Sequence, residues 1–368
     1  MVAVLTSVQT AKNEMLVNEL TLKNFRNHIN KSLKFEKGLT VINGPNGIGK
    51  TNILEALYVL ATGRAARARY DREMINYESI FCSILAHTSS SEYEYDLEMQ
   101  IITNDNFSNM ASKRCKVNKV ARTIQHLIGL FNAVMFSPQD IDLVIGSPSD
   151  RRKFIDNVLI QTSKTYKKQL SEYNKALKQR NKVLELINET GNGTDQLGFW
   201  TNQILNLGIQ IQKARTELLD YISNRTKEYI KTLDKPESRL AITYKKNEMT
   251  SERLEKHLDH DIASKTTLVG PHKDDFEMDY NGHDLAHFGS RGQQRTVLLT
   301  IKLSEVDYFE KETGERPVLL LDDIFSELDE HHKEMVIKTI TKQQTILTFA
   351  EKPDFIDLTT CNLIILSE

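Results

Sequence analysis

The sequence has few cysteines, and those that it has form no recognisable pattern. Its 368 residues include three cysteines, Cys82, Cys115 and Cys361, together with seven prolines and one tryptophan. Three widely spaced cysteines do not make a disulfide framework or a cysteine-based metal site. This scarcity is typical of proteins in a reducing environment, so we predict a cytoplasmic location.

Long hydrophobic runs are missing as well. No apolar stretch approaches the ~18 residues that a membrane-spanning helix needs. Residues 1–14 lack the basic start and apolar centre of a signal peptide, and we interpret them as an N-terminal extension. We expect no membrane partner, and a role in membrane transport would need a separate membrane subunit.

An excess of charge of one sign is the third absence. The 48 Lys and Arg residues are matched by 50 Asp and Glu residues, which gives a formal net charge of −2 at pH 7. Binding of a polyanion such as DNA cannot therefore depend on the charge of the whole chain. It would depend on local clusters of basic side chains.

The most informative motif that is present is GPNGIGKT, which fits the pattern of a phosphate-binding loop. Residues 39–42 precede it as an apolar strand, and residues 52–60 follow it with helical spacing. In this context the loop amides and the helix N-terminus attract phosphate oxygens. We predict ATP or GTP binding, Lys50 neutralising β- and γ-phosphate charge and Thr51 holding Mg²⁺. The predicted contacts are Gly44, Pro45, Asn46, Gly47, Ile48, Gly49, Lys50 and Thr51.

A second motif supplies carboxylates. Residues 317–321 form an apolar run typical of a central parallel strand, and Asp322 and Asp323 follow it directly. Ligands bind at the carboxyl ends of such strands. We predict that Asp322 holds Mg²⁺, usually through water, and that Asp323 orients or deprotonates the attacking water.

Further segments resemble those of ABC ATPases. SRGQQ at residues 290–294 is similar to the ABC signature, with Arg291 in place of its first glycine. The resemblance implies that Ser290, Gly292 and Gln293 open a helix over residues 296–306. The N-terminus of that helix would point at the nucleotide bound by a second subunit.

The remaining ABC-like segments include one departure from the pattern. The segment 137–140 resembles a glutamine loop, whose Gln139 would sense Mg²⁺ and the γ-phosphate, and SELD at residues 326–329 resembles the turn at the dimer seam. Residues 344–350 fall where transport ATPases carry a switch histidine, but the nearest polar side chain is Thr348. Most ABC ATPases also have Glu where this chain has Asp323, so we expect slow hydrolysis.

Segments along nearly the whole chain resemble the bacterial RecF family, which is related to the SMC and Rad50 ATPases. The matching segments are residues 20–28, 42–57, 135–156, 268–278, 290–305 and 319–329. The resemblance implies an α/β fold, an ABC-type P-loop ATPase head with an inserted α-helical hairpin domain. It also implies that Arg26, and less directly Asn24, approach the nucleotide.

The same resemblance implies a function. Members of the family are ATP-dependent homodimers that bind DNA and prefer gaps and junctions of single- and double-stranded DNA. This chain has no base-reading module such as a zinc finger, so we expect binding without sequence choice. They help RecO- and RecR-like mediator proteins to load recombinase in DNA repair, replication and the SOS response. ATP hydrolysis would be weak, stimulated by DNA, and used as a switch.

Three clusters of basic residues are candidates for DNA contacts. The first comprises Arg64, Arg67, Arg69 and Arg72, and the second Lys113, Arg114 and Lys116, with Lys119 beside them. The third lies in residues 151–182, where ten Lys and Arg residues face two acidic residues; from it we select Lys164, Lys167 and Lys168. A solvated surface explains any one cluster equally well, but three clusters together favour a polyanion-binding face.

Periodicity predicts the layout of the chain. We expect residues 15–118 to form the first lobe of the ATPase head and residues 267–368 its second part. Residues 119–266, with the glutamine-loop region at their start, would form the insertion. Within it, apolar residues recur at steps of 3 and 4 on both sides of a turn at residues 191–195. They predict an antiparallel helical hairpin with arms of roughly 30 residues, or about 45 Å.

Two alternatives remain open at this point. One is an ATPase subunit of a membrane transporter, against which the helical hairpin and the missing switch histidine count. The other is an architectural DNA protein that uses ATP only to dimerise. We assign no chemistry to the polar run His272–Asp275, which we expect to shape the loop before the signature segment.

Overall fold

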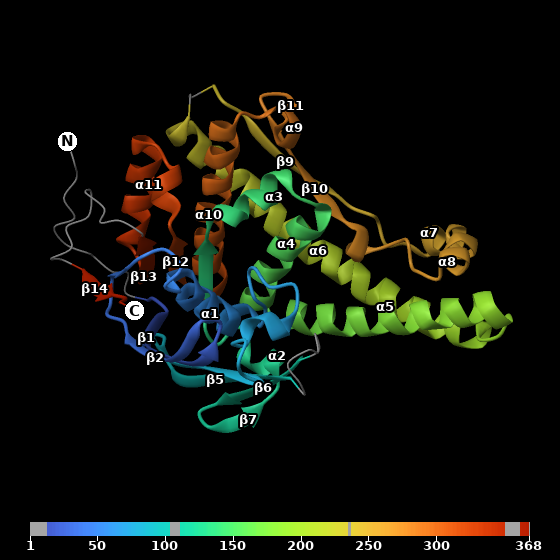
Figure 1. Cartoon of the computed structure of the whole chain (residues 1–368). Helices are drawn as coiled ribbons and strands as arrows, with labels where there is room; N and C mark the ends of the chain where they lie inside the picture. Colours follow the sequence, from blue (N-terminus) through green and yellow to red (C-terminus); the bar gives the residue numbers. More distant parts are fainter. Residues whose placement is uncertain (1–12, 104–110, 235–236, 350–360, 368) are drawn as a thin grey trace. The chain divides into compact units, whose positions relative to one another are not determined.

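The computed structural model describes residues 13–103, 111–234, 237–349 and 361–367 (Figure 1). Contacts divide the chain into two compact units, Met1–Asp140 with Lys302–Glu368 and Ile141–Ile301. Of the predicted N-terminal extension, residues 1–12 lie outside the described residues.

The bounds of these units differ from those of the domains expected from the sequence. We expected an insertion at residues 119–266, whereas the second unit comprises Ile141–Ile301. Strand β8 (Ala133–Phe136) belongs to the first unit because it pairs with β12 (Val318–Asp322). Strand β10 (Asp275–Tyr280) belongs to the second because it pairs with β9 (Leu240–Lys245). Long-range strand pairing, which periodicity does not reveal, decides both boundaries.

A five-stranded parallel sheet carries the candidate site. Its order is β14-β3-β13-β12-β8, with β3 (Leu39–Asn43), β13 (Thr345–Phe349) and β14 (Asn362–Ile365) joining the two strands named above. Every residue of β8, β12 and β13 is buried, as expected for strands of a parallel sheet covered on both faces, and most of these residues are apolar. Strand β13 lies between β3 and β12, so the phosphate-loop strand and the carboxylate strand end at the same edge of the sheet.

Helix α1 (Lys50–Thr62) lies between this sheet and a second one. The second sheet is antiparallel, with the order β2-β1-β4-β5-β6-β7. Its strands are β1 (Leu16–Phe25), β2 (His28–Lys34), β4 (Phe81–Ser89), β5 (Glu94–Thr103), β6 (Ala111–Val117) and β7 (Val120–Arg122). Because α1 contacts strands of both sheets, ten of its 13 residues are buried, and they join both sheets in one hydrophobic core.

The buried side chain of Gln344 ties the two sheets together at a β-bulge in β1. Its Oε1 accepts from the amide of Val17 at 2.8 Å, and its Nε2 donates to the carbonyl of the same residue at 2.8 Å and to that of Glu36 at 2.9 Å. The side chain thus replaces the ladder partners that the bulge removes.

Short helices complete the first unit. They are η1 (Asp71–Met74), α2 (Ile124–Leu127), η4 (Ile324–Glu327) and α11 (Glu330–Ile340), while η2 (Pro138–Ile141) and α10 (Arg291–Thr313) contain the boundaries between the units.

The second unit is built on the predicted helical hairpin, which we call the arm. Helices α5 (Lys164–Thr190) and α6 (Thr194–Leu233) contain 27 and 40 residues, so the second is longer than the roughly 30 residues expected (Figure 1). They pack against each other and are joined at Gly191 and Gly193, whose φ angles of 72° and 101° suit glycine. The other elements are α3 (Asp142–Ile145), α4 (Pro148–Thr162), α7 (Ser251–Lys256), α8 (Leu258–Ser264), η3 (Pro271–Lys273), β11 (His283–Asp284) and α9 (Leu285–Phe288).

None of the helices in the described ranges combines the length and the apolar composition that crossing a membrane requires.

Candidate nucleotide-binding site

The phosphate loop joins β3 to α1 and needs glycine for two reasons. Gly47 and Gly49 have φ angles of 83° and 105°, a region that other residues rarely adopt. A Cβ on Gly49 would also lie 2.5 Å from Oδ1 of Asn27 and 2.6 Å from Nε2 of His28. The backbone shape requires the glycine directly before the helix, and a larger residue there would also displace the ends of the Asn27 and His28 side chains.

Lys50 lies at the N-terminus of α1, and its side chain folds back over the loop. Its Nζ donates to the carbonyls of Gly44 at 2.7 Å and Pro45 at 2.9 Å. Burial lowers the pKa of Lys50, while the nearby carboxylates of Asp323 and Asp322 oppose this shift. Within the described part of the chain the hydrogen-bond acceptors of this buried ammonium group are carbonyls, which it is suited to exchange for the more negative oxygens of a phosphate.

Oxygen atoms gather where α1 begins and β12 and β13 end. Thr51 and Thr348 both donate to Oδ1 of the buried Asp322, at 2.7 and 2.9 Å. A carboxylate and a hydroxyl in contact are the ligands that Mg²⁺ prefers, so these residues fit that ion. Thr348, singled out as a substitute for the switch histidine, is buried and holds Asp322 in place.

Asp323 follows the strand in an unusual backbone conformation. Its φ and ψ are 50° and 31°, in the left-handed region, and its amide donates to Oγ1 of Thr348 at 3.2 Å. Its carboxylate is close enough to Lys50 to oppose the lowering of that residue's pKa. Gln139, the predicted sensor, is exposed in η2, directly after the neighbouring strand β8.

Arg26, the predicted nucleotide contact, is held by acidic and backbone groups. Its Nε and Nη2 donate to the two carboxylate oxygens of Glu55, both at 3.0 Å, and Nη1 donates to the carbonyl of Glu73 at 2.7 Å. Glu55 is completely buried in α1, one helical turn after Thr51. The sequence analysis missed Glu55, although a carboxylate inside an apolar helix was a signal that could have revealed it.

Two asparagines and a histidine connect the turn between β1 and β2 to the loop, and sequence reasoning missed them too. Asn27 accepts from Nδ2 of Asn52 at 2.8 Å and donates to the carbonyl of Gly47 at 3.4 Å. Nε2 of His28 lies 3.0 Å from the carbonyl of Gly49, and burial lowers the pKa of His28. These contacts brace the loop from the outside.

The signature segment forms the N-terminus of α10. The side chain of Ser290 accepts from the amide of Gln293 at 3.3 Å, and that of Gln293 accepts from the amide of Ser290 at 2.8 Å. This reciprocal pair is a capping box, so α10 begins at Arg291 and not at the predicted residue 296. Ser290 and Gly292 are exposed, as a contact with a second subunit requires.

Several basic residues predicted to contact DNA are engaged elsewhere. Arg67 donates to Oδ1 of Asn52 at 2.8 Å and to Glu55 at 3.4 Å. Lys113 is bound to Asp71 at 2.5 Å and to the carbonyl of Gly63 at 3.0 Å. Arg72 donates to a backbone carbonyl, and Lys116 pairs with Glu98 on the adjacent strand.

Other members of the clusters are exposed. Arg69 lies over the ring of Tyr70. Lys167 is half-buried, and burial lowers its pKa, with Lys164 adding to the shift. Of the predicted contacts, the exposed ones are Arg64, Arg67, Arg69, Arg114, Lys164 and Lys168, and Arg67 is exposed although it also contacts Glu55. The structure thus separates the predicted contacts into engaged and accessible ones.

The fold and the site define a class of protein: an ABC-type P-loop ATPase head, in which the loop and the carboxylate strand meet at one edge of a parallel sheet. A family model described as the RecF/RecN/SMC N terminal domain matches residues 16–354. The chain is 36% identical to the DNA replication and repair protein RecF of Acetivibrio thermocellus, over 93% of this chain and 95% of the relative. It is 35% identical to that of Natranaerobius thermophilus, over 93% and 92%. The chain belongs to the RecF family.

Solved structures agree with this assignment. A structure of the recombination mediator protein RecF with ATP, in the RecFOR pathway, has a TM-score of 0.85 and 34% identity, over 94% of this chain and 95% of that one. A second, RecF-ATPrS, has a TM-score of 0.83 and 32% identity over the same shares. The Smc head domain of Pyrococcus furiosus, at 16% identity and a TM-score of 0.55, shares the fold.

Proposed function

We propose that this chain is a cytoplasmic, ATP-switched DNA-binding protein of recombinational repair and replication, which closes as a homodimer on DNA and hydrolyses ATP slowly. The observation that carries the proposal is the meeting of Lys50, Thr51 and Asp322 at one edge of the parallel sheet. Family membership and the ATP named for a solved relative support it.

The nucleotide site is assigned residue by residue. Lys50 and the loop amides bind the β- and γ-phosphates, and Thr51 and Asp322 hold Mg²⁺ directly or through water. Bound ATP with Mg²⁺ supplies the phosphoanhydride bond and the negative charge that the dimer recognises. Asp323 orients the attacking water or takes its proton, and Gln139 senses the γ-phosphate.

The switch is a shift between open and closed dimers. Ser290, Gly292 and Gln293 of one subunit, at the exposed N-terminus of α10, contact the nucleotide held by the loop of the other. ATP favours the closed dimer only as far as it binds that form more tightly. Closure brings basic faces onto gapped duplex or junction DNA, and slow hydrolysis releases it.

The partners follow from the same assignment. A solved relative is described as a recombination mediator in the RecFOR pathway, and we extend this role to the chain, with RecO- and RecR-like proteins and recombinase as partners. The ATPase activity is weak and stimulated by DNA.

Sedimentation of the protein tests the proposal, with and without ATP–Mg²⁺ and with and without a gapped duplex. We expect a dimer that forms only with ATP and sediments with the DNA. A monomer indifferent to both ligands would overturn the proposal. A dimer that forms with ATP but whose ATPase rate ignores DNA would favour an architectural role, and brisk turnover without DNA would favour a transporter subunit.

A further inference from the structure

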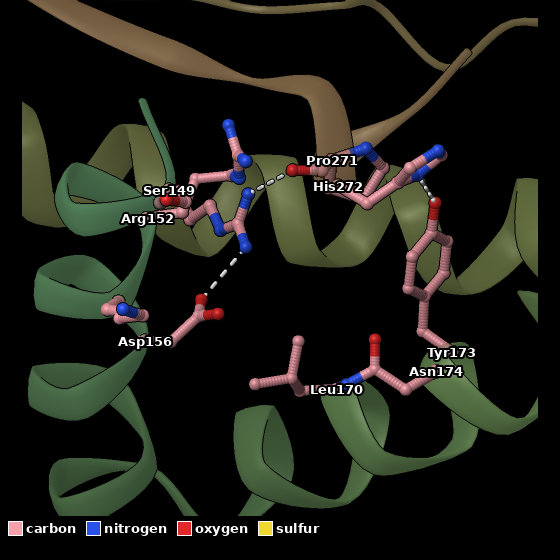
Figure 2. Close-up of a pocket in the computed structure, with 10 residues that line it drawn as sticks. Ser149, Arg152, Asp156, Leu170, Tyr173, Asn174, Pro271 and His272 are labelled. Carbon is pink, nitrogen blue, oxygen red and sulfur yellow. Dashed lines mark hydrogen bonds and ion pairs between the residues drawn. The ribbon is translucent and has the colours of Figure 1, made fainter. Parts of the chain in front are cut away.

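A small cavity lies at the base of the arm, within the second unit (Figure 2). Its volume is about 200 Å³, and it is lined by α4, by the first half of α5, by Arg215 of α6 and by the segment at Pro271 and His272. Arg152 and Lys153 lie on the α4 side, while Leu170 and Tyr173 face it from α5. The proposed nucleotide site uses none of these residues.

The guanidinium group of Arg152 is oriented before any ligand arrives. Its Nη1 donates to the carbonyl of Asp274 at 2.7 Å, and among the described residues no other hydrogen bond occupies its remaining donors. The group is half-buried, which limits its rotation. A planar fork with one edge held and the other open is suited to bind two oxygens of one phosphate.

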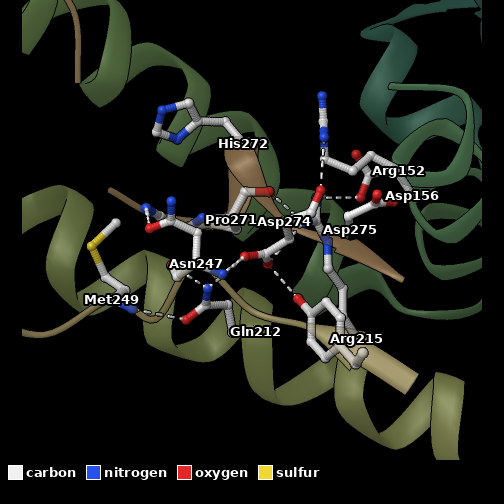
Figure 3. Close-up of polar contacts among 12 residues, drawn as sticks. Arg152, Asp156, Gln212, Arg215, Asn247, Met249, Pro271, His272, Asp274 and Asp275 are labelled. Carbon is white, nitrogen blue, oxygen red and sulfur yellow. Dashed lines mark hydrogen bonds and ion pairs between the residues drawn. The ribbon is translucent and has the colours of Figure 1, made fainter. Parts of the chain in front are cut away.

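The carbonyl that holds Arg152 belongs to a buried polar network (Figure 3). The Asp274 carboxylate is 1% exposed and accepts from Nε2 of Gln212 at 2.9 Å and from the amide of Asn247 at 2.7 Å. Tyr244 and Arg215 also donate to it. A fully satisfied network fixes the backbone at this point, so Arg152 is placed by groups from α6 and the loop after β9.

The other polar groups around the cavity are neutral or already paired. The Asp156 carboxylate accepts from Nη2 of Arg215 at 2.8 Å and from the hydroxyl of Tyr166 at 2.6 Å. His272 must donate from Nε2 to the carbonyl of Thr267, because a carbonyl can only accept, and Nδ1 then accepts from Tyr173. Of the cationic side chains that line the cavity, Arg215 is held between Asp156 and Asp274, which leaves Arg152 and, at the surface beside Asp150, Lys153 to attract an anion.

We propose that this cavity anchors a backbone phosphate of DNA, with Arg152 as the bidentate donor and Lys153 as a second charge at the rim. The inference rests on the proposed DNA-binding function and adds a site to it. The basic segment 151–182 continues from the cavity along α5, through the exposed Lys164 and Lys168. A row of separate charges matches a chain of phosphates better than a single acidic side chain.

The structure also removes two members of that segment from the DNA surface. Arg151 makes two hydrogen bonds to Asp275, at 2.6 and 2.8 Å. Arg180 is 1% exposed and pairs with Asp261 at 2.7 Å. Both arginines are engaged within the fold, which leaves Arg152 as the arginine of this segment with open donors.

The test measures the affinity of the full-length protein for a gapped duplex, in the presence of ATP–Mg²⁺, over a series of NaCl concentrations. For Arg152→Gln we expect affinity to fall on the order of tenfold and the slope of log K against log salt to shrink by about 0.9, the value for one phosphate contact. Arg239→Gln, which removes an exposed arginine from the same unit, should change neither quantity. Lys153→Gln is a second variant in case Arg152→Gln fails to fold, because it removes an exposed contact with Asp150 at 3.3 Å that contributes little to stability. It should also reduce the slope.

The outcomes separate this inference from the proposed function. If the unchanged protein does not bind DNA, the proposed function fails. If it binds and both variants keep its slope, only the anchoring site is overturned. If the two variants keep the salt slope of DNA binding but inorganic phosphate no longer raises their melting temperature, the cavity binds a free anion. An unchanged slope with weaker binding of polyglutamate would assign it to an acidic protein segment, and either result overturns the DNA assignment.

Discussion

At the scale of single residues, the site depends on hydroxyl groups and carboxylates that hold one another. Thr51 and Thr348 share one oxygen of Asp322, and no hydrogen bond from the residues that the structure describes occupies the second oxygen of that carboxylate. Asp323 stands beside them in a strained backbone conformation and close to Lys50. The two neighbouring carboxylates therefore have different surroundings, and we assign them different roles.

Replacing Asp323 by Asn should separate binding from hydrolysis. The amide cannot take a proton from water, so we expect ATP turnover to fall by about 100-fold or more while nucleotide binding persists. The closed dimer should then remain on DNA, which sedimentation and phosphate release measure together. Lys50→Ala is the control that loses nucleotide binding itself. Faster release of DNA by the Asp323→Asn protein would contradict the scheme.

His272 should make stability depend on pH. Burial lowers its pKa below the ordinary value of 6.5, because the charged ring would lose its hydration, and the hydrogen bond that the ring donates to the carbonyl of Thr267 opposes this shift only in part. The unfolded chain binds the proton more readily, so stability is complete above about pH 6.5 and is lost as pH falls below it.

The measurement is the urea midpoint of unfolding at about pH 7.5 and about pH 5.5. The wild-type midpoint should fall towards acid, and His272→Asn should show a smaller fall. The exposed His260, replaced by Asn, is the matched control and should keep the wild-type dependence. Equal falls in all three proteins would show that His272 does not contribute.

At the scale of elements, α10 carries the signature segment at its N-terminus and a buried ion pair in its middle. Lys302 and Glu305 lie 2.7 Å apart and are 7% and 4% exposed. Burial raises the pKa of Glu305, and Lys302 opposes the shift. A pair of this kind stabilises little by itself, but the loss of one partner strands a buried charge.

Lys302→Ala should therefore destabilise the protein by about 3–5 kcal/mol in urea unfolding. Replacing both Lys302 and Glu305 by Met removes both charges and should restore most of the loss. On the exposed part of the same helix, Lys311 pairs with Glu312 at 2.6 Å, and Lys311→Ala should cost less than about 1 kcal/mol. Similar losses at the two lysines would mean that burial of the pair is unimportant.

At the scale of the whole molecule, the proposed function is a coupling between two ligands. If ATP closes a dimer that binds DNA, then DNA must raise the affinity for ATP by the same factor, because both equilibria share one closed state. The proposed phosphate loop and the carboxylates Asp322 and Asp323 lie in the first unit, whereas the signature segment and the cavity at Arg152 lie in the second.

This reciprocity is measurable with the slow Asp323→Asn protein, in which hydrolysis does not disturb the titrations. We expect ATP to tighten DNA binding, and DNA to tighten ATP binding, by one common factor within roughly 5- to 150-fold. Titrations of labelled DNA and of labelled nucleotide, each with and without the other ligand, give the two factors. Unequal factors would show that the ligands do not act through a single closed state.

The sequence by itself determined the class of the protein and the two halves of its candidate nucleotide site. A phosphate loop consists of a few adjacent residues with a strand before and a helix after, so GPNGIGKT can be recognised from the local sequence. The apolar run that ends at Asp322 can be recognised in the same way. The arm could also be predicted from the sequence, because apolar residues repeat at helical spacing along α5 and α6. The capping box at Ser290 and Gln293 was equally local, and attention to it would have placed the start of α10 correctly.

Tertiary structure alone decided which charged groups are available. Arg26 and Arg67 meet on the buried Glu55, Lys113 meets Asp71, and Asp322 meets a threonine 271 positions earlier in the chain. The sequence does not show whether a lysine or arginine side chain is ion-paired, because its partner is set by packing between distant segments. For that reason the basic clusters could be counted from the sequence, but only the folded chain distinguished Arg151, held by Asp275, from its neighbour Arg152, which faces a cavity.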